Sequence, residues 1–436
     1  MANTRLTKTF SGASNRKTMT FSFWVKRTKI SSGMYIANAG AGGNPEAGIE
    51  FNSDDTFTFW EGGVYNQKPT RKFRDPNAWY HIVVAVDTTQ ITEANRVKIY
   101  VNGVQETVMS TNTFPSENAD LSWNTTMVHT IGAYYGNSNN FDGILSHFHF
   151  IDGTAYAASD FGSTDATTGE WKINTSPSVT YGTNGFFILK DGNSVTDQSS
   201  NTNNFTVANG TLTATVDNPS NNYCVWNILH AQTGGIGTIG NGNTYLATQT
   251  DNTWRTAYGS IAFPGTGKFY CEFKCGNMGN DQFIGIIDVD QQSPANSNFA
   301  NESRAYCYRK TGVKENAGSG SSYGDSWTSL DYLQIAYNNG AIWFGKNGTW
   351  QNSATQSEIS AGTTTNAAFT SIDTSKHYTI AWNGYNDDMI ELNAGNGHFR
   401  TTTDGSNNPS SGDTEAKFKY SVPTGYQPIS TKGINS

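Results

Sequence analysis

The chain of 436 residues is long enough for two or three domains of ~150–200 residues each. Its aromatic content of 13% argues against a disordered protein, and its formal net charge of −8 argues against a protein that binds nucleic acid by neutralising phosphates. The sequence has no run of ~18 apolar residues and no apolar stretch near its first residues, so we expect neither membrane insertion nor a secretory signal.

Alternating apolar and polar residues, typical of β-strands, run through the first part of the chain. At 18–25 the apolar side chains share one face, except Trp24, which stands among Thr and Ser on the other face. The run 79–86 is almost continuously apolar, as expected for a central strand of a sandwich. At 97–101 the alternation ends in Asn102-Gly103, a pair that favours a type I′ hairpin turn.

Further along the chain the pattern loosens over 162–241, where Gly, Asn, Ser and Thr dominate. Strand-like alternation then returns at 268–275, 283–289, 332–337 and 341–345. We therefore predict an all-β protein of two antiparallel β-sandwiches (jelly rolls), one over 1–161 and one over 242–436. The irregular segment 162–241 would connect them.

Several segments before residue 160 resemble the strands of laminin-G-like, concanavalin-type jelly rolls. They are 20–26, 79–87, 97–103, Ile131-Gly132-Ala133 and Phe141-Asp142-Gly143-Ile144-Leu145. Pieces of the stretch 150–207 in turn resemble the segment that follows such a jelly roll in tail-fibre-like proteins of marine bacteriophages. The two resemblances together imply a phage protein with an amino-terminal laminin-G-like domain.

The last part of the chain resembles a SPRY domain. The segments that carry this resemblance are 267–273, 283–286, 323–327, 342–348 and 422–428. SPRY modules are antiparallel β-sandwiches that bind partners through loops and have no catalytic residues to carry over. The resemblance therefore implies a second sandwich with a binding role.

Catalytic residues of the concanavalin-like glycosidases are paired carboxylates on one strand face. The nearest candidates here are Asp288 and Asp290, which lack a partner Glu and read more simply as a strand end. We therefore predict that the chain is not an enzyme and needs no cofactor.

Two kinds of metal site are considered. Calcium stays open because laminin-G-like folds bind it through loop aspartates, although solvated turns explain the candidates more simply. These candidates are Asp54, Asp55, Asp75, Asp87, Asp120 and Asp142. His147 and His149 share a predicted strand face, and three such pairs around a trimer axis would suit a transition metal. A partly buried strand explains the two histidines more simply, so no metal site is predicted.

A group of aromatic residues lies beside Gly- and Asn-rich turns, where not all of the rings can belong to the core. It consists of Trp60, Tyr65, Tyr134, Tyr135 and Trp350. Such rings stack on sugars or anchor protein–protein interfaces, and packing beneath a loop is the third alternative. As binding residues they are expected to be exposed on loop faces.

These inferences together favour a structural virion protein of a bacteriophage, of fibre or appendage type, that acts in adhesion. It would bind host-surface glycans or dock to other virion proteins, after assembly in the host cytoplasm. A homo-oligomer is expected, with a trimer favoured because phage fibres are commonly trimeric and open sheet edges need cover. The alternatives are a glycan-binding lectin module of non-viral origin and a phage head decoration protein.

Overall fold

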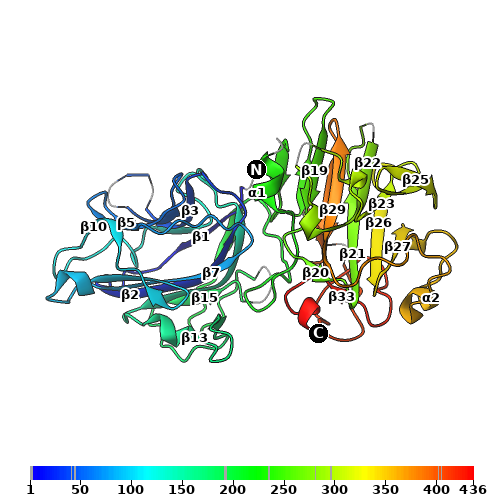
Figure 1. The fold of residues 1–436 in the computed structure, drawn as a ribbon. Coiled ribbons are helices and arrows are strands. Elements are labelled where there is room, and N and C mark those ends of the chain that lie inside the picture. The colour runs from blue at the N-terminus through cyan, green and yellow to red at the C-terminus, as the bar shows by residue number, and fades with distance from the viewer. Residues whose placement is uncertain are drawn as a thin grey trace. The chain divides into compact units, whose positions relative to one another are not determined.

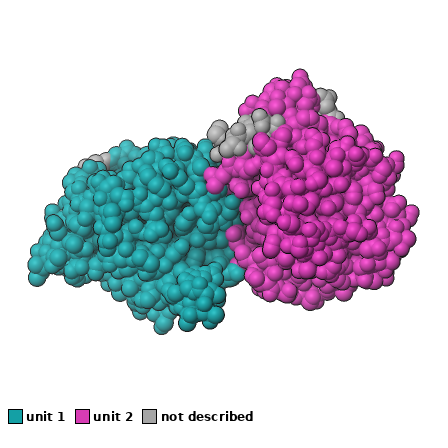
Figure 2. Space-filling view, in the orientation of Figure 1, with its two compact units in different colours: residues 1–214, 218–220 teal, residues 215–217, 221–436 magenta. Residues whose placement is uncertain are grey.

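The computed structural model describes residues 3–436 apart from 41, 44–45, 191–193, 234–235, 280, 295–296, 401 and 404. Its contacts divide the chain into two compact units, Met1–Ala214 with Asn218–Ser220 and Thr215–Asp217 with Asn221–Ser436 (Figure 1; Figure 2). Each unit is built mainly from antiparallel β-sheets. The prediction of an all-β protein with two sandwiches is confirmed.

The first unit contains two sheets that pack face to face. Sheet A has the strand order β10 (Met109–Thr113), β6 (Tyr65–Pro69), β5 (Phe57–Glu61), β4 (Ala47–Phe51), β3 (Met34–Ala39), β11 (Val128–Ile131), β1 (Arg5–Thr9) and β16 (Thr206–Asn209). Sheet B has the order β15 (Phe186–Ile188), β12 (Gly143–Asp152), β2 (Thr18–Arg27), β7 (Trp79–Asp87), β8 (Val97–Val101) and β9 (Val104–Gln105).

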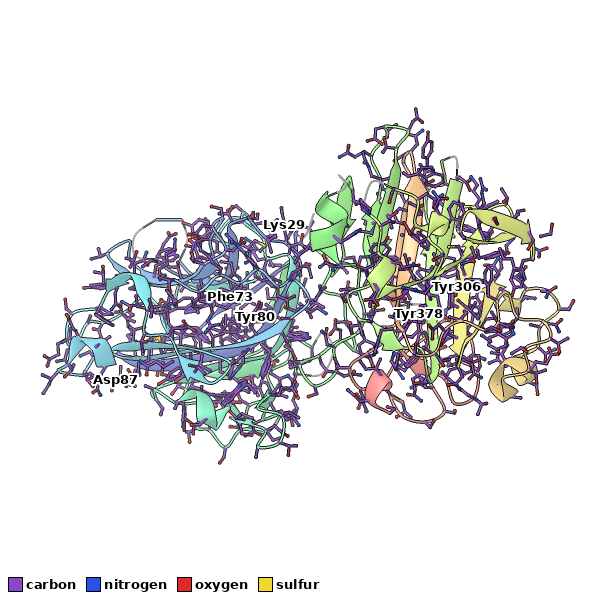
Figure 3. The ribbon with its side chains drawn as sticks, in the orientation of Figure 1. Lys29, Phe73, Tyr80, Asp87, Tyr306 and Tyr378 are labelled. Carbon is purple, nitrogen blue, oxygen red and sulfur yellow. The ribbon has the colours of Figure 1, made fainter. Side chains whose placement is uncertain are left out.

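The core of this unit lies between the two sheets, where the alternating apolar residues of each strand meet. Phe21 and Phe23 of β2 and Val84 of β7 belong to it, as the sequence pattern predicts. Phe73, from the loop before β7, packs edge-to-face on Tyr80 with ring centroids 5.1 Å apart (Figure 3). The Asn102-Gly103 turn between β8 and β9 has positive φ at both residues, as a type I′ turn requires.

The outer face of sheet B is covered by residues 153–185, called here the cover segment. It carries β13 (Gly162–Thr164) and β14 (Trp171–Ile173), and its residues Ala158 and Phe161 form a small core with Val83 and Ile151 of sheet B. The continuous apolar run of β7 is explained because both faces of this strand are buried. The structure thus differs from the expected connecting segment 162–241, most of which, up to Ala214, packs within the first unit.

The second unit is also a pair of sheets. Sheet C has the order β17 (Thr238–Gly240), β18 (Tyr245–Ala247), β30 (Met389–Asn393), β21 (Lys268–Cys275), β26 (Tyr332–Asn338), β27 (Ala341–Lys346) and β28 (Thr349–Trp350), with β33 (Gln427–Pro428) beside β21. Sheet D has the order β19 (Trp254–Tyr258), β29 (His377–Tyr385), β22 (Asp281–Asp288), β23 (Ala305–Arg309), β24 (Val313–Asn316) and β25 (Ser319–Ser322), with β20 (Phe263–Pro264) beside β29.

The remaining elements are short. They are α1 (Ile228–Thr233), α2 (Gln356–Ala361), the strand pair β31 (His398–Phe399) and β32 (Thr402–Thr403), and the 3-10 turns η1 (Glu93–Asn95), η2 (Ala158–Asp160), η3 (Val289–Gln291), η4 (Phe299–Asn301) and η5 (Gly433–Asn435). Within the described ranges, no helix is long and apolar enough to cross a membrane.

A buried carboxylate forms hydrogen bonds with the carboxy-terminal segment, defined here as residues 416–426, and holds it on the outer face of sheet C. Glu272 of β21 accepts hydrogen bonds from the backbone N–H groups of Lys419 and Tyr420, both at 2.8 Å, and from the Tyr270 hydroxyl at 2.8 Å. Burial raises the pKa of Glu272 to about 7. Beneath this segment Phe418 packs in one core with Trp350.

Candidate functional site

Residues of four neighbouring strands form a row across the outer face of sheet A. The register pairs Asn38 of β3 with Gly48 of β4, Gly48 with Trp60 of β5, and Trp60 with Asn66 of β6. Gly48 has no side chain, and the indole of Trp60 fills the space above it. A Cβ atom on Gly48 would lie only 2.5 Å from Trp60 Nε1. The Trp60 ring therefore leans over β4 instead of projecting straight from the sheet.

Three half-buried rings meet at this point and are called here the aromatic cluster: Tyr35, Trp60 and Tyr134. The Tyr35 ring lies 6.3 Å from that of Trp60 at an interplanar angle of 89°. It lies 4.8 Å from the Tyr134 ring at 44°. Tyr134 comes from the loop after β11, where its backbone N–H donates to the carbonyl of Ser138 at 2.9 Å. The cluster therefore joins two strands and a loop that are far apart in the sequence.

Two carboxylates border the aromatic cluster. Glu46, just before β4, accepts hydrogen bonds from the Tyr134 hydroxyl at 2.7 Å and from the backbone N–H groups of Gly42 and Gly43 at 2.7 and 2.8 Å. The bond to Glu46, together with burial, raises the pKa of Tyr134 to about 12. Glu50 pairs with Tyr35 in the strand register, and burial raises the pKa of its carboxyl. Both negative charges thus lie at ring edges.

Lys68 of β6 is a cation near Glu50, but it interacts with two carboxylates and therefore neutralises Glu50 only in part. Its ammonium group lowers the pKa of Glu50, an effect smaller than that of burial. It also forms an ion pair with Asp54 at 3.3 Å. The surface consequently combines ring faces with carboxylate acceptors, which can stack on the C–H faces of a sugar and accept its hydrogen bonds.

The structure separates the aromatic residues that were predicted from the sequence. Trp60 and Tyr134 come together in the aromatic cluster, and the neighbouring Tyr135 is 41% exposed. Tyr65 lies opposite Glu61 in the register, so it is on the other face of the sheet from Trp60. Tyr65 is half-buried, and its hydroxyl is 3.4 Å from the Ser116 hydroxyl.

The expectation that Trp350 lies exposed is wrong. Trp350 belongs to the second unit, is 6% exposed, and its indole N–H donates to Gln356 at 2.7 Å. The carboxy-terminal segment and α2 cover this part of sheet C, so a ring beside a turn becomes a core residue. Trp60 and Tyr134 are half-buried, which is also less exposed than expected.

Sequence reasoning missed Tyr35, Glu46 and Glu50. A signal was present, because Glu46, Gly48 and Glu50 alternate with apolar residues and therefore share one face of a strand. A glycine inside a strand often marks a place where another group approaches the backbone closely. Tyr35 carries no comparable signal, because only the folded sheet brings it next to Trp60.

The two histidines that were considered as a metal pair both lie against the ring of Phe187, with ring centroids 5.7 Å away for His147 and 3.9 Å away for His149. A β-bulge between Ser146 and His149 interrupts the alternation, and His147 has a φ of 47°. His147 Nδ1 lies 2.7 Å from the Ser146 hydroxyl, whereas His149 Nδ1 lies 2.8 Å from the Tyr181 hydroxyl. Across the described part of the chain, no three His, Cys, Asp or Glu side chains are grouped as metal ligands.

Several of the aspartates considered for calcium have other partners. Asp55 is buried and forms ion pairs with Arg27 at 3.1 Å and Arg74 at 3.2 Å. Asp142 accepts a hydrogen bond from the Thr28 hydroxyl at 3.1 Å.

The two acids considered for glycoside hydrolysis lie at the end of β22 in the second unit. Asp288 is buried, forms an ion pair with Arg304 and caps η3 by accepting from the backbone N–H of Asp290 at 2.9 Å. The Asp290 side chain is 64% exposed and lies 3.4 Å from Lys376. The nearby rings of Tyr306 and Tyr378 are 6.3 Å apart (Figure 3). Asp288 thus serves as a structural anchor.

Comparison with known families identifies the first unit. Residues 4–160 match the family model described as the Concanavalin A-like lectin/glucanases superfamily. The first unit has a concanavalin A-like, laminin-G-like fold. The matched residues include β1 to β12 and therefore the whole aromatic cluster. No curated protein matches the sequence.

Solved structures similar to part of the chain include SPRY domains. The SPRY domain of human HERC1 is 16% identical, with 34% of this chain and 87% of that chain covered and a TM-score of 0.26. A human SPRY domain is 13% identical, with 36% and 94% covered and a TM-score of 0.28. The PSpry domain of TRIM65 is 8% identical, with 39% and 89% covered and a TM-score of 0.29. At these TM-scores the likeness says nothing about function.

Proposed function

We propose that the first unit binds glycans at the aromatic cluster of sheet A. The observation that carries the proposal is the half-buried Trp60, whose indole leans over Gly48 between two carboxylates. A ring held in this way loses little conformational freedom when a sugar stacks on it, and the carboxylates accept hydroxyl protons. The lectin-type family model that matches residues 4–160 is consistent with this role.

Replacing Trp60 by Ala tests the proposal. Loss of the stacking ring should weaken glycan binding by ~1–3 kcal/mol, the range for an aromatic anchor at a binding surface. Tyr65→Ala is the matched control, because Tyr65 is a half-buried ring on the adjacent strand but on the other face. Binding would be measured by titration with oligosaccharides on the full chain. Equal binding by wild type and Trp60→Ala would reject the site.

We further propose that this binding serves adhesion by a bacteriophage virion protein of fibre or appendage type. The support is the resemblance of 150–207 to tail-fibre-like proteins and the pairing of a lectin-type unit with a second β-sandwich. Other virion proteins are its expected partners, and a homotrimer is the expected state. Antibody labelling of particles released by lysis tests the assignment, and labelled heads without labelled tails would favour a decoration protein instead.

The proposed role is binding without catalysis. Asp288 is engaged by Arg304 and by the turn it caps, and Asp290 is paired with Lys376. These contacts give Asp288 a structural role and leave Asp290 on the surface beside a lysine. Release of reducing ends from polysaccharides, abolished by Asp288→Asn, would overturn this part of the proposal.

A further inference from the structure

The rings of the aromatic cluster have an arrangement suited to a positive charge. Tyr35 and Trp60 are nearly perpendicular at 89°, and Tyr35 and Tyr134 are inclined at 44°. The faces of aromatic rings carry partial negative charge, and rings that meet at steep angles surround ammonium groups in proteins. A neutral sugar needs a single flat platform, whereas this cluster offers walls in more than one plane.

The carboxylates beside these rings add full negative charge. Glu46 already accepts three hydrogen bonds, from Tyr134, Gly42 and Gly43, so of its roughly four acceptor positions about one remains. Glu50 lies opposite Tyr35 in the strand register; burial raises the pKa of its carboxyl, whereas a hydrogen bond from Tyr35 and the charge of Lys68 favour the ionised form.

The balance of charge around the cluster is negative. Lys68, the cation beside Glu50, divides its charge between Glu50 and Asp54. The formal net charge of −8 on the whole chain also draws cations toward the protein. Acidic sugars, sulfates and phosphates would be repelled from this surface.

We propose that the aromatic cluster selects glycans that carry a protonated amine, with the ammonium group held between the rings of Tyr35 and Trp60 and the Glu50 carboxylate. The ligand class is therefore amino sugars with a free amine rather than neutral, N-acetylated or acidic sugars. This inference rests on the proposed glycan-binding function and adds the chemistry of the ligand to it.

The test uses two ligands that differ at the C2 nitrogen of each sugar unit, which is a charged amine in one and a neutral acetamide in the other. Oligomers of glucosamine and oligomers of N-acetylglucosamine of equal length are titrated into the full chain at a pH where the amine is protonated. Wild type should bind the free-amine oligomer at least ~10-fold more tightly, the effect expected for a partly desolvated cation–π and ion-pair contact. Added salt should reduce this preference, because partly exposed charges are screened.

The variant Glu50→Gln keeps the shape of the side chain and removes its charge. It should lower the preference for the amine over the acetylated oligomer to less than ~3-fold, because the charge that attracts the ammonium group is removed. Glu93→Gln is the matched control, since Glu93 is an exposed acid in η1. Circular dichroism of each variant verifies its fold, and Glu46→Gln provides a second variant if Glu50→Gln does not fold.

The outcomes separate the two proposals. Equal affinity of wild type for both oligomers would overturn the amine inference and leave glycan binding standing. Failure of wild type to bind either oligomer would overturn the amine inference, and glycan binding itself would be overturned only if neutral oligosaccharides also failed to bind. A preference for the amine that survives in Glu50→Gln and in Glu46→Gln would show that the charge is recognised elsewhere, and the assignment to the aromatic cluster would be rejected.

Discussion

The two outer faces of the first sandwich carry similar residues in different surroundings. On sheet B, Trp24 stacks on His81 with ring centroids 4.9 Å apart, and both side chains are buried. There the indole N–H of Trp171 donates to His81 Nδ1 at 3.0 Å. On sheet A, Tyr35 and Trp60 are half-buried, with carboxylates at their edges instead of a covering segment.

The difference shows how one kind of side chain takes two roles. Where the chain folds back over a sheet, aromatic and histidine side chains become a second core and their hydrogen bonds are satisfied internally. Where the rings remain half-exposed beside carboxylates that Lys68 neutralises only in part, part of their interaction capacity is left for a ligand. The following predictions test whether the two faces really differ in this way.

The largest expected effect is on stability at the covered face. Trp24→Ala removes a buried indole and should lower the free energy of unfolding by ~3–5 kcal/mol. Trp60→Ala removes a half-buried indole and should cost about 1–2 kcal/mol. Urea unfolding of the full chain measures both. Similar losses of unfolding free energy for the two variants would show that the two faces do not differ in burial.

The next effect is the pH dependence of the covered face. Burial lowers the pKa of His81 to about 3 and that of His149 well below its ordinary value. Because these folded pKa values lie below the unfolded value of ~6.5, the stabilisation is present above pH ~6.5 and is lost as the pH falls. His81 alone should cost about 2–3 kcal/mol of unfolding free energy by pH ~4.5, and His149 should act in the same direction.

The variant His149→Gln isolates this effect from the titration of buried carboxyls such as Glu61, whose pKa is raised to about 7. The gap in unfolding free energy between wild type and His149→Gln should shrink as the pH falls from ~6.5 to ~4.5, because only wild type must then keep a buried imidazole neutral. Parallel pH profiles would mean that His149 is not held neutral under the cover segment.

An intermediate effect is expected from crowding the open face. Gly48→Ala places a Cβ 2.5 Å from Trp60 Nε1, so the indole must move. Overpacking of this kind should cost about 1–3 kcal/mol and change the near-ultraviolet circular dichroism of the tryptophans. Gly33→Ala is the control, because a Cβ there meets no atom within 4 Å. An unchanged spectrum for Gly48→Ala would place Trp60 elsewhere.

The smallest effect is expected from Tyr134→Phe. The change keeps the ring and removes the hydrogen bond to Glu46, which retains its bonds from the backbone of Gly42 and Gly43. Stability should fall by about 0.5–1.5 kcal/mol, measured as a shift of the urea midpoint. A loss above ~3 kcal/mol would make the aromatic cluster a structural element like the covered face of sheet B.

The sequence by itself determined the strands and the class of fold. Period-two alternation is a local property, so 18–25, 79–86 and 97–101 could be assigned as strands, and Asn102-Gly103 as a turn, without tertiary information. The laminin-G-like motifs likewise predicted the fold of the first unit, which the family match over residues 4–160 supports.

Only the tertiary structure decided which faces are covered and which rings meet. Alternation of apolar and polar residues indicates which residues share a strand face, but it does not indicate which distant segment packs on that face. Trp171 of the cover segment packs on His81, and Phe418 of the carboxy-terminal segment packs in one core with Trp350, although no local pattern near His81 or Trp350 predicts these contacts. Tyr35, Trp60 and Tyr134 form one cluster because sheet pairing joins strands that the sequence separates, and long-range pairing leaves no local pattern to read.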